Sequence, residues 1–271
     1  MKAKGALVGV IHLPALPGSP NASRKLADIV QEAVASARVL EYAGYEVCML
    51  ENYGDVPFYR GEVPPITIAA MSVVAQEVRR AVGVPLGINV LRNDARAALA
   101  IAHVVSAAVI RVNVLTGARV TDQGVVEGNA ALLLRERAAL GGGGPDGVAI
   151  WADVDVKHSG ALGALQTVAQ ETSDLVVRAL ADAVLVTGEG TGHAVDTEKL
   201  AAVARAARAN DREVSVLVAS GATIEALPTL AKYADGVIVG SALRANGKAG
   251  GPIDPRAAGA FAEAFRKAFA R

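Results

Sequence analysis

The sequence predicts an α/β protein folded as a (β/α)8, or TIM, barrel. Short apolar runs rich in β-branched residues alternate eight times with longer Ala-rich segments, which is the pattern of βαβ units. Hydrophobic residues make up 52% of the chain and aromatic residues only 4%. The core is therefore built from Ala, Val, Leu and Ile, which fill the interior of parallel-stranded barrels. The 271 residues suit one such barrel, and we expect a single domain over residues 1–271.

The eight strands are expected at 7–11, 46–51, 85–90, 108–112, 148–153, 183–187, 214–219 and 236–239. The helices that follow them are expected at 25–42, 65–82, 94–105, 129–140, 162–180, 197–209, 224–232 and 254–269. Residues with known preferences for helix ends support these boundaries. Pro65 can begin the second helix, Gly44 can end the first, and Asp196 and Thr223 are suitable N-caps.

Composition excludes several classes of partner. Lys plus Arg and Asp plus Glu both number 27, with no run of like charge, so nucleic acid is not favoured. The single cysteine, Cys48, excludes an intrachain disulfide. No stretch approaches the roughly 18 consecutive apolar residues of a membrane span. The N-terminal apolar run ends in His12-Leu13-Pro14 without a small-residue cleavage site, which favours a cytoplasmic protein.

Polar side chains stand at alternate positions near the ends of several expected strands. Alternate side chains of a strand point to opposite faces, and the outer face of a barrel strand lies against apolar helices. This polar set is therefore expected to point inward, into the mouth where such barrels keep their chemistry. Its members are Glu51, Asn89, Arg111, Asn113, Trp151, Asp153 and Asp155.

Three glycine-containing turns, each directly after a β-branched run, predict a phosphate site. Glycine at a strand end lets backbone N–H groups approach an anion, and neighbouring hydroxyls can donate as well. Each turn taken alone could be an ordinary connecting loop, but three after the last three strands match the recurrent phosphate site of these barrels. The predicted phosphate-binding residues are Thr187, Gly188, Ser220, Gly221, Gly240 and Ser241, within segments 186–192, 219–223 and 239–243.

Candidate catalytic residues lie at the same expected end of the barrel. Glu51 ends the second strand as a candidate general acid or base, and its alternative is a structural ion pair with Arg111. Asp153, Asp155 and Lys157 share one side if their strand continues that far, so an acid and the amine together could move a proton, or the lysine could neutralise an oxyanion. A Schiff base on Lys157 stays open. The predicted catalytic set is His12, Glu51, Asp55, Asp153 and Lys157.

Further polar residues are candidates for holding the rest of a substrate. His158 follows a strand end, whereas His103 lies in an expected helix. Asp94 suits an N-cap, which leaves Arg92 free to bind a carboxylate or a second phosphate. The predicted substrate-binding set is Asn89, Arg92, Arg111, Asn113 and His158.

No short-spaced ligand motif predicts a metal, and no cofactor is identified. Mg²⁺ stays open as an alternative, because it favours oxygen ligands together with substrate phosphates. The side chains that could hold it are His12, Glu51, Asp55, Asp153 and Asp155.

Several segments together resemble the BtpA family. They are residues 9–20, 51–58, 89–94, 111–114, 121–124 and 152–158 and the three phosphate turns, and the resemblance spans essentially the whole chain. It implies a relative of the ribulose-phosphate-binding barrels. The family is named for photosystem I biogenesis in cyanobacteria, but members also occur in organisms without photosynthesis, so the resemblance indicates the fold more firmly than the function.

Three functions are therefore open. The first is an enzyme acting on a phosphosugar or nucleotide-like metabolite by acid–base catalysis, as an isomerase, lyase or phosphoribosyl-type transferase. The second is a non-catalytic assembly factor, which predicts a sizeable exposed apolar patch. The third is a sensor that binds phosphate without turnover. We expect a homo-oligomer, since symmetric dimers are common, with the 201–209 helix as a possible apolar contact surface.

Overall fold

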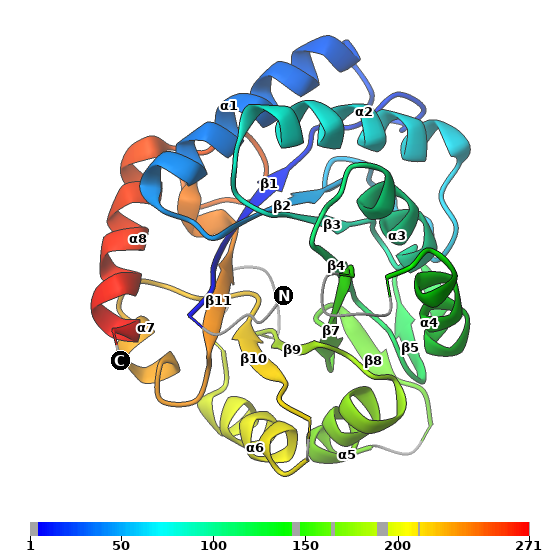
Figure 1. Cartoon of the computed structure of the whole chain (residues 1–271), viewed down its shortest axis with the longest axis vertical. Helices are drawn as coiled ribbons and strands as arrows, with labels where there is room; N and C mark the ends of the chain where they lie inside the picture. The colour runs from blue at the N-terminus through cyan, green and yellow to red at the C-terminus, as the bar shows by residue number, and fades with distance from the viewer. Residues whose placement is uncertain (1–4, 143–146, 164–165, 189–194, 211, 271) are drawn as a thin grey trace.

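The protein is a closed barrel of eight parallel strands, each followed by helical structure on the outside (Figure 1). The computed structural model describes residues 5–142, 147–163, 166–188, 195–210 and 212–270. Around the barrel the strand order is β1-β11-β10-β9-β7-β4-β3-β2, which confirms the (β/α)8 prediction. The barrel strands are β1 Leu7–His12, β2 Val47–Glu51, β3 Leu86–Asn89, β4 Val109–Val112, β7 Ala149–Val154, β9 Ala183–Val186, β10 Ser215–Val218 and β11 Gly236–Val239.

The helices form the outer layer of the barrel. They are α1 Leu26–Ala43, α2 Pro65–Ala81, α3 Ala95–Val104, α4 Ala130–Ala139, α5 Val168–Ser173, α6 Thr197–Arg208, α7 Leu227–Leu230 and α8 Pro255–Phe269. Most predicted end signals are confirmed. Pro65 begins α2, Gly44 ends α1 with a φ of 88°, and Asp196 caps α6 by accepting from two backbone N–H groups.

Two predicted helices were too long. The helix expected at 162–180 begins only at Val168, where Thr167 and Gln170 form a capping box, and it continues as a π-helical turn over Asp174–Arg178. Residues 164–165 lie outside the described part of the chain. The helix expected at 224–232 is reduced to α7, because Thr223 accepts from the Ala226 N–H and holds a turn that precedes the helix.

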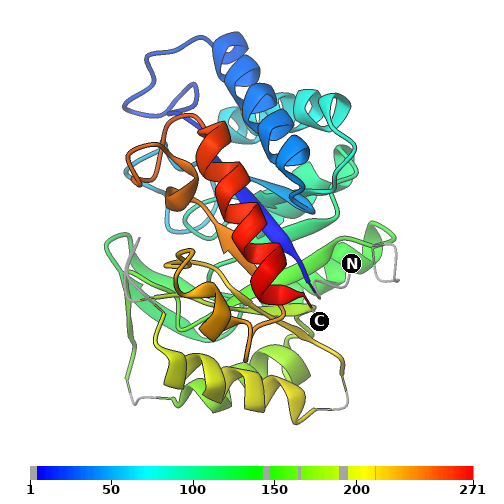
Figure 2. The ribbon, with the colours of Figure 1, turned by 90° about the vertical axis from the view of Figure 1, so that its left-hand side faces the viewer.

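A small antiparallel sheet was not predicted at all. It consists of β5 Ala118–Thr121, β6 Gly124–Glu127 and β8 Ser159–Ala161, in the order β6-β5-β8. Gly124, with a φ of 98°, supplies the left-handed residue that closes the β5–β6 hairpin. In Figure 2 this hairpin projects from the same end of the barrel as the segments that follow β1 and β11.

Strand alternation divides the core into two layers. On β1, Leu7 and Ile11 pack outward against the helices, whereas Val8 and Val10 point into the barrel. The interior layer is built mainly from aliphatic side chains around one fully buried tryptophan, Trp151. This filled interior leaves the carboxyl ends of the strands as the place where polar groups can gather.

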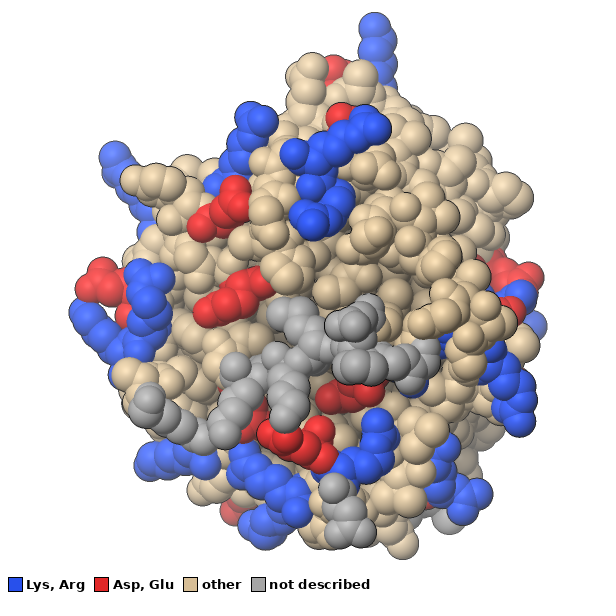
Figure 3. Space-filling view, in the orientation of Figure 1, with Lys and Arg blue, Asp and Glu red and all other residues tan. Residues whose placement is uncertain are grey.

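On the face shown in Figure 3, acidic and basic side chains are scattered around the rim, and neither sign of charge predominates. Within the described residues, no helix combines the length and apolar character needed to cross a membrane. The proposed contact surface on the 201–209 helix was wrong. Ala201, Val203, Ala204 and Ala207 are buried inside this chain, since they form the side of α6 that packs on the barrel.

Candidate functional site

The inward-pointing polar residues gather at the carboxyl ends of the barrel strands, as strand parity predicted. On β2, Val47 and Met49 fill the interior, and Glu51 is the next inward residue. The same register places Asp153 above Trp151 on β7. The inward polar residues of this end, all less than 10% exposed, are His12, Glu51, Asn89, Arg111, Asn113 and Asp153.

Arg111 and Asp153 form a buried two-point ion pair. The Arg111 Nε and Nη2 atoms donate to the two Asp153 oxygens at 3.1 and 3.0 Å. Asn113 donates to Asp153 Oδ2 at 2.6 Å, and Asn89 donates to Asn113 Oδ1 at 3.3 Å. Because both oxygens of Asp153 are engaged, its carboxylate holds Arg111 in place rather than offering a free base.

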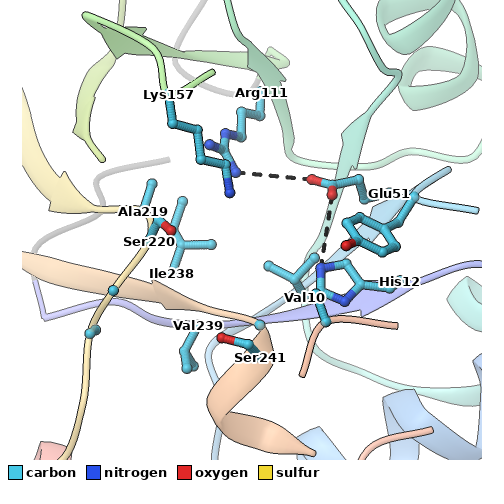
Figure 4. A pocket seen from close by; sticks show the side chains of 15 residues that line it. Val10, His12, Glu51, Arg111, Lys157, Ala219, Ser220, Ile238, Val239 and Ser241 are labelled. Atoms are coloured by element: carbon cyan, nitrogen blue, oxygen red, sulfur yellow. Dashed lines mark ion pairs between the residues drawn. The ribbon is translucent and has the colours of Figure 1, made fainter. Parts of the chain in front are cut away.

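Glu51 is buried at 8% exposure, but its carboxylate accepts no hydrogen bond from the described residues. Its closest basic atoms are His12 Nε2 at 3.8 Å and Arg111 Nη1 at 4.0 Å, beyond hydrogen-bond distance. Figure 4 shows these two contacts as dashed lines, with Lys157 beside Arg111 on the opposite wall of the pocket. The Glu51 carboxylate therefore lies near positive charge, but no described donor forms a hydrogen bond to either of its oxygens.

The environment lowers the pKa of two nearby bases. Burial lowers the pKa of Lys157, and Arg111 adds to that effect. Burial also lowers the pKa of His12 well below its ordinary value, with further contributions from Arg244, Lys157 and Arg111. Both shifts have the same physical origin, because protonation would place another positive charge in a desolvated, already basic site.

One hydrogen bond fixes which nitrogen of His12 carries the proton. The Gly250 N–H donates to His12 Nδ1 at 3.1 Å. A neutral imidazole that accepts at Nδ1 carries its proton on Nε2. The His12 Nε2–H group therefore faces the Glu51 carboxylate.

The predicted phosphate turns after β10 and β11 meet at this pocket. Ser220, Gly221, Gly240 and Ser241 line it together with His12, Glu51, Arg111 and Lys157. In the described part of the chain, the N–H groups of Ser220, Gly221, Ala222 and Gly240 donate to no protein acceptor. A Cβ on Gly240 would lie 3.0 Å from His12 Cε1, so the close approach of these two segments favours glycine.

The turn after β9 contributes less to the pocket. Thr187 and Gly188 are buried at the end of β9 and are not among the residues that line it. The Thr187 hydroxyl is nevertheless buried, and it has no hydrogen-bond partner among the described residues. The rest of this predicted segment, residues 189–192, lies outside the described residues.

The structure places three other predicted residues away from the pocket. Asp55 accepts from the Leu16 N–H and from Asn52, where burial raises its pKa, and it lines a separate pocket. Arg92 is not free, because its Nη2 donates to the Lys157 carbonyl at 2.6 Å. His158 is exposed and does not line the pocket.

Asp155 does not share the inward side with Asp153 and Lys157. The strand β7 ends at Val154, and Asp155 has a φ of 48°, so the alternation stops there. Its carboxylate instead bonds Arg119 and Lys199. With Asp55 and Asp155 both directed elsewhere, the described residues contain no group of three that could hold a metal ion.

Three residues of the site were missed as functional candidates. Tyr53 and Ala249 line the pocket, and Arg244 lies beside it with a buried guanidinium. Tyr53 directly follows the Glu51-Asn52 pair, and Arg244 directly follows the Gly-Ser-Ala-Leu turn. A search for basic residues just beyond the phosphate turns would have found Arg244.

Fold and site together define a (β/α)8 barrel with a charged, glycine-lined pocket at the carboxyl ends of its strands. The model of the BtpA family matches residues 3–267, and the chain belongs to this family. An uncharacterized protein of Methanocaldococcus jannaschii is 44% identical over 253 residues, covering 93% of this chain and 91% of that protein. The photosystem I biogenesis protein BtpA of Synechocystis is 40% identical over 259 residues, covering 96% and 87%.

Solved structures share the barrel at much lower identity. Phosphoribosyl anthranilate isomerase from Thermus thermophilus matches with a TM-score of 0.53 and 14% identity, over 96% of this chain and 98% of that chain. A likeness at this identity shows the fold alone.

Proposed function

We propose that the protein is an enzyme that binds a small phosphorylated metabolite, a phosphosugar or nucleotide-like compound, and acts on it by acid–base catalysis with Glu51 as the base. The observation that carries this proposal is the state of the Glu51 carboxylate, which is buried, lines the pocket and accepts no hydrogen bond from a described residue. A purely structural carboxylate at this depth would have its oxygens hydrogen-bonded, as those of Asp153 are. The unused acceptor suits a proton taken from a ligand.

The charge of the mouth supports an anionic ligand. Its buried or half-buried basic side chains outnumber the two carboxylates, Glu51 and Asp153. These bases are Arg111 and Lys157, which line the pocket, and Arg244, which lies beside it. A phosphomonoester carries roughly −1.5 to −2 at neutral pH, so it would offset this excess better than a singly charged diester.

The free backbone N–H groups support a place for the phosphoryl group. Those of Ser220, Gly221 and Gly240 could donate to its oxygens, with the hydroxyls of Ser220 and Ser241 close by. Glu51 lines the same pocket, so a small phosphorylated substrate held there would bring its carbon chain toward the carboxylate.

Two donors, one neutral and one cationic, complete the acid–base set. The His12 Nε2–H and the Lys157 ammonium stand near Glu51, and either could stabilise an oxyanion that forms as a proton leaves carbon. Such a set suits isomerase or lyase chemistry next to a carbonyl. The isomerase activity in the name of the Thermus thermophilus barrel belongs to the same reaction class.

An assembly role, as in the name of the Synechocystis relative, gives no reason for inward-pointing charges at the mouth. The pocket would then be a by-product of the fold, and substitution of Glu51 would leave the function of the protein unchanged. We therefore favour catalysis.

The test is hydrogen exchange from carbon. A panel of phosphosugars is incubated with the protein in D₂O, and the loss of C–H signals is followed by proton NMR. We expect exchange with at least one of them, and Glu51→Gln should slow it about 10²–10⁴-fold without weakening inorganic phosphate binding, because the substitution removes a negative charge from the pocket. The exposed Glu198→Gln is the matched control. Absence of exchange together with absence of phosphate binding would contradict the proposal.

A further inference from the structure

Arg244 is a buried cation in direct contact with no carboxylate of the described residues, and Glu51 acts on its charge only from a longer distance. Arg244 is 4% exposed and forms no ion pair within the described part of the chain, and its Nη2 atom has no hydrogen-bond partner there. Burial is the main reason that its pKa falls to about 10. An isolated buried charge is expensive, so a guanidinium in this state indicates either an anion that binds nearby or a strong structural demand.

The contacts of Arg244 lie on the phosphate turn itself. Its Nη1 donates to the Gly240 carbonyl at 2.5 Å, and its Nε donates to the Gly251 carbonyl at 3.4 Å. Gly240 and Ser241 line the pocket, whereas Arg244 does not. The guanidinium therefore stands behind the turn rather than inside the pocket.

Two donors hold the direction of the peptide that joins Gly240 to Ser241, because the Gly240 carbonyl accepts from Arg244 Nη1 and from the Leu243 N–H at 3.0 Å. The peptide is trans, and in a planar trans peptide the carbonyl and the following N–H point in opposite directions. Since Arg244 draws the Gly240 carbonyl toward itself, the Ser241 N–H points away from Arg244. The Gly240 oxygen is thereby directed toward the guanidinium, and the Ser241 amide hydrogen is directed to the opposite side of the peptide.

The same guanidinium also reaches the segment that orients His12. Gly251, which accepts from Arg244, follows Gly250, whose N–H donates to His12 Nδ1. Arg244 thus contacts the phosphate turn at one end and the support of His12 at the other.

We infer that Arg244 is a positioning residue of the anion site, which orients the Gly240–Ser241 peptide toward a bound phosphoryl group and supplies the positive field behind it. This inference rests on the proposed function. It assigns the residue that sets the affinity for the phosphoryl group, separately from Glu51, which would act on the carbon chain.

The experiment compares Arg244→Met, Arg244→Lys and the exposed control Arg256→Met in the full chain. Inorganic phosphate is the probe, and its affinity is read from thermal shifts across a concentration series and from the amide NMR signal of Ser241. We expect Arg244→Met to weaken phosphate binding about tenfold or more. Arg244→Lys should recover part of this loss, because lysine keeps the charge but cannot bond both carbonyls through a rigid fork.

The melting temperature without phosphate separates this role from a structural one. Replacing a buried cation that has no ion-pair partner among the described residues by an apolar side chain should leave it within about 3 °C of the wild type or raise it. A purely structural role predicts instead a large drop in both variants with phosphate affinity unchanged. If Arg244→Met does not fold, Arg244→Lys decides, since an unchanged affinity there overturns the inference.

The two proposals fail in different ways. Absence of phosphate binding by the wild type would overturn both. Binding by the wild type that Arg244→Met preserves in full would overturn the role of Arg244 and leave the proposed function standing.

Discussion

Two clusters, each with two carboxylates and two bases, lie near the end of β7, and they differ in how completely they are paired. We call Glu51, Asp153, Arg111 and Lys157 the mouth cluster, and Asp155, Glu171, Arg119 and Lys199 the side cluster. In the side cluster, Lys199 bonds Asp155 at 2.7 Å, Arg119 bonds it on its other oxygen, and Glu171 accepts the Asp155 N–H at 2.9 Å. In the mouth cluster, Asp153 takes both bonds of Arg111, and Glu51 is left without one.

The difference indicates what each cluster is for. The side cluster joins β5 to α5 and α6, and the paired bases hold the pKa of Asp155 below its ordinary value despite its partial burial. The side cluster therefore attaches the small antiparallel sheet to the barrel through Arg119 of β5. In the mouth cluster one carboxylate accepts no hydrogen bond from a described residue, and burial lowers the pKa of Lys157, with a further contribution from Arg111. This state agrees with the proposed catalytic role.

The largest loss of stability is expected on substitution of Asp153, and it tests whether the two clusters differ in structural importance. Asp153→Asn removes the charge that compensates buried Arg111 and brings an amide N–H against the Arg111 or Asn113 donors, so the free energy of unfolding should fall by about 3–5 kcal/mol. The matched Asp155→Asn should cost only about 1 kcal/mol, since the Asp155 side chain is 38% exposed and screened. Urea denaturation of both variants measures this, and equal losses would show that the two clusters play the same structural part.

A double substitution tests whether the Arg111–Asp153 ion pair is needed for the fold or for ligand binding. Arg111→Met with Asp153→Leu replaces both charges by apolar side chains of similar size, and the free energy of unfolding should return to within about 1–2 kcal/mol of the wild type. Phosphate binding should be lost, because a buried base of the mouth is gone. A double variant as unstable as Asp153→Asn would mean that the ion pair is needed for the fold itself.

The barrel could be predicted from the sequence because the same strand–helix pattern recurs eight times along the chain. Eight β-branched runs and eight Ala-rich segments give independent support for one topology, and strand parity then placed Glu51, Arg111 and Asp153 inward correctly. The small sheet was missed because its strands are only three or four residues long and partly exposed. Such short runs give no periodic signal that separates a hairpin from a loop.

Within the site, the sequence located residues but not their contacts. Asp155 was placed with Asp153 because the alternation was extended one residue pair too far, past the left-handed backbone at Asp155. Arg92 was considered free because nothing in the local sequence shows that the Lys157 carbonyl, 65 residues away, accepts from it. Arg244 could have been found by its position directly after the third predicted phosphate turn, but the burial of its charge is a property of the tertiary structure.

The smallest expected effect concerns His12 and depends on pH. Its pKa in the folded protein lies well below 6.5, so the unfolded chain binds more protons as the pH falls through that value. Stability should therefore be fully present above this pH and decline below it, with a slope of at most about 1.4 kcal/mol per pH unit.

His12→Asn should flatten this decline, because the Asn oxygen can still accept from Gly250 but cannot be protonated. Denaturation midpoints at about pH 7.5 and about pH 5.5 measure the change, above the range in which carboxylates of ordinary pKa titrate. The exposed His103→Asn serves as control and should keep the wild-type slope. An identical slope in the wild type and His12→Asn would mean that His12 is free to protonate in the folded protein. The Nε2–H group could then not act as the fixed neutral donor that distinguishes the mouth from the fully paired side cluster.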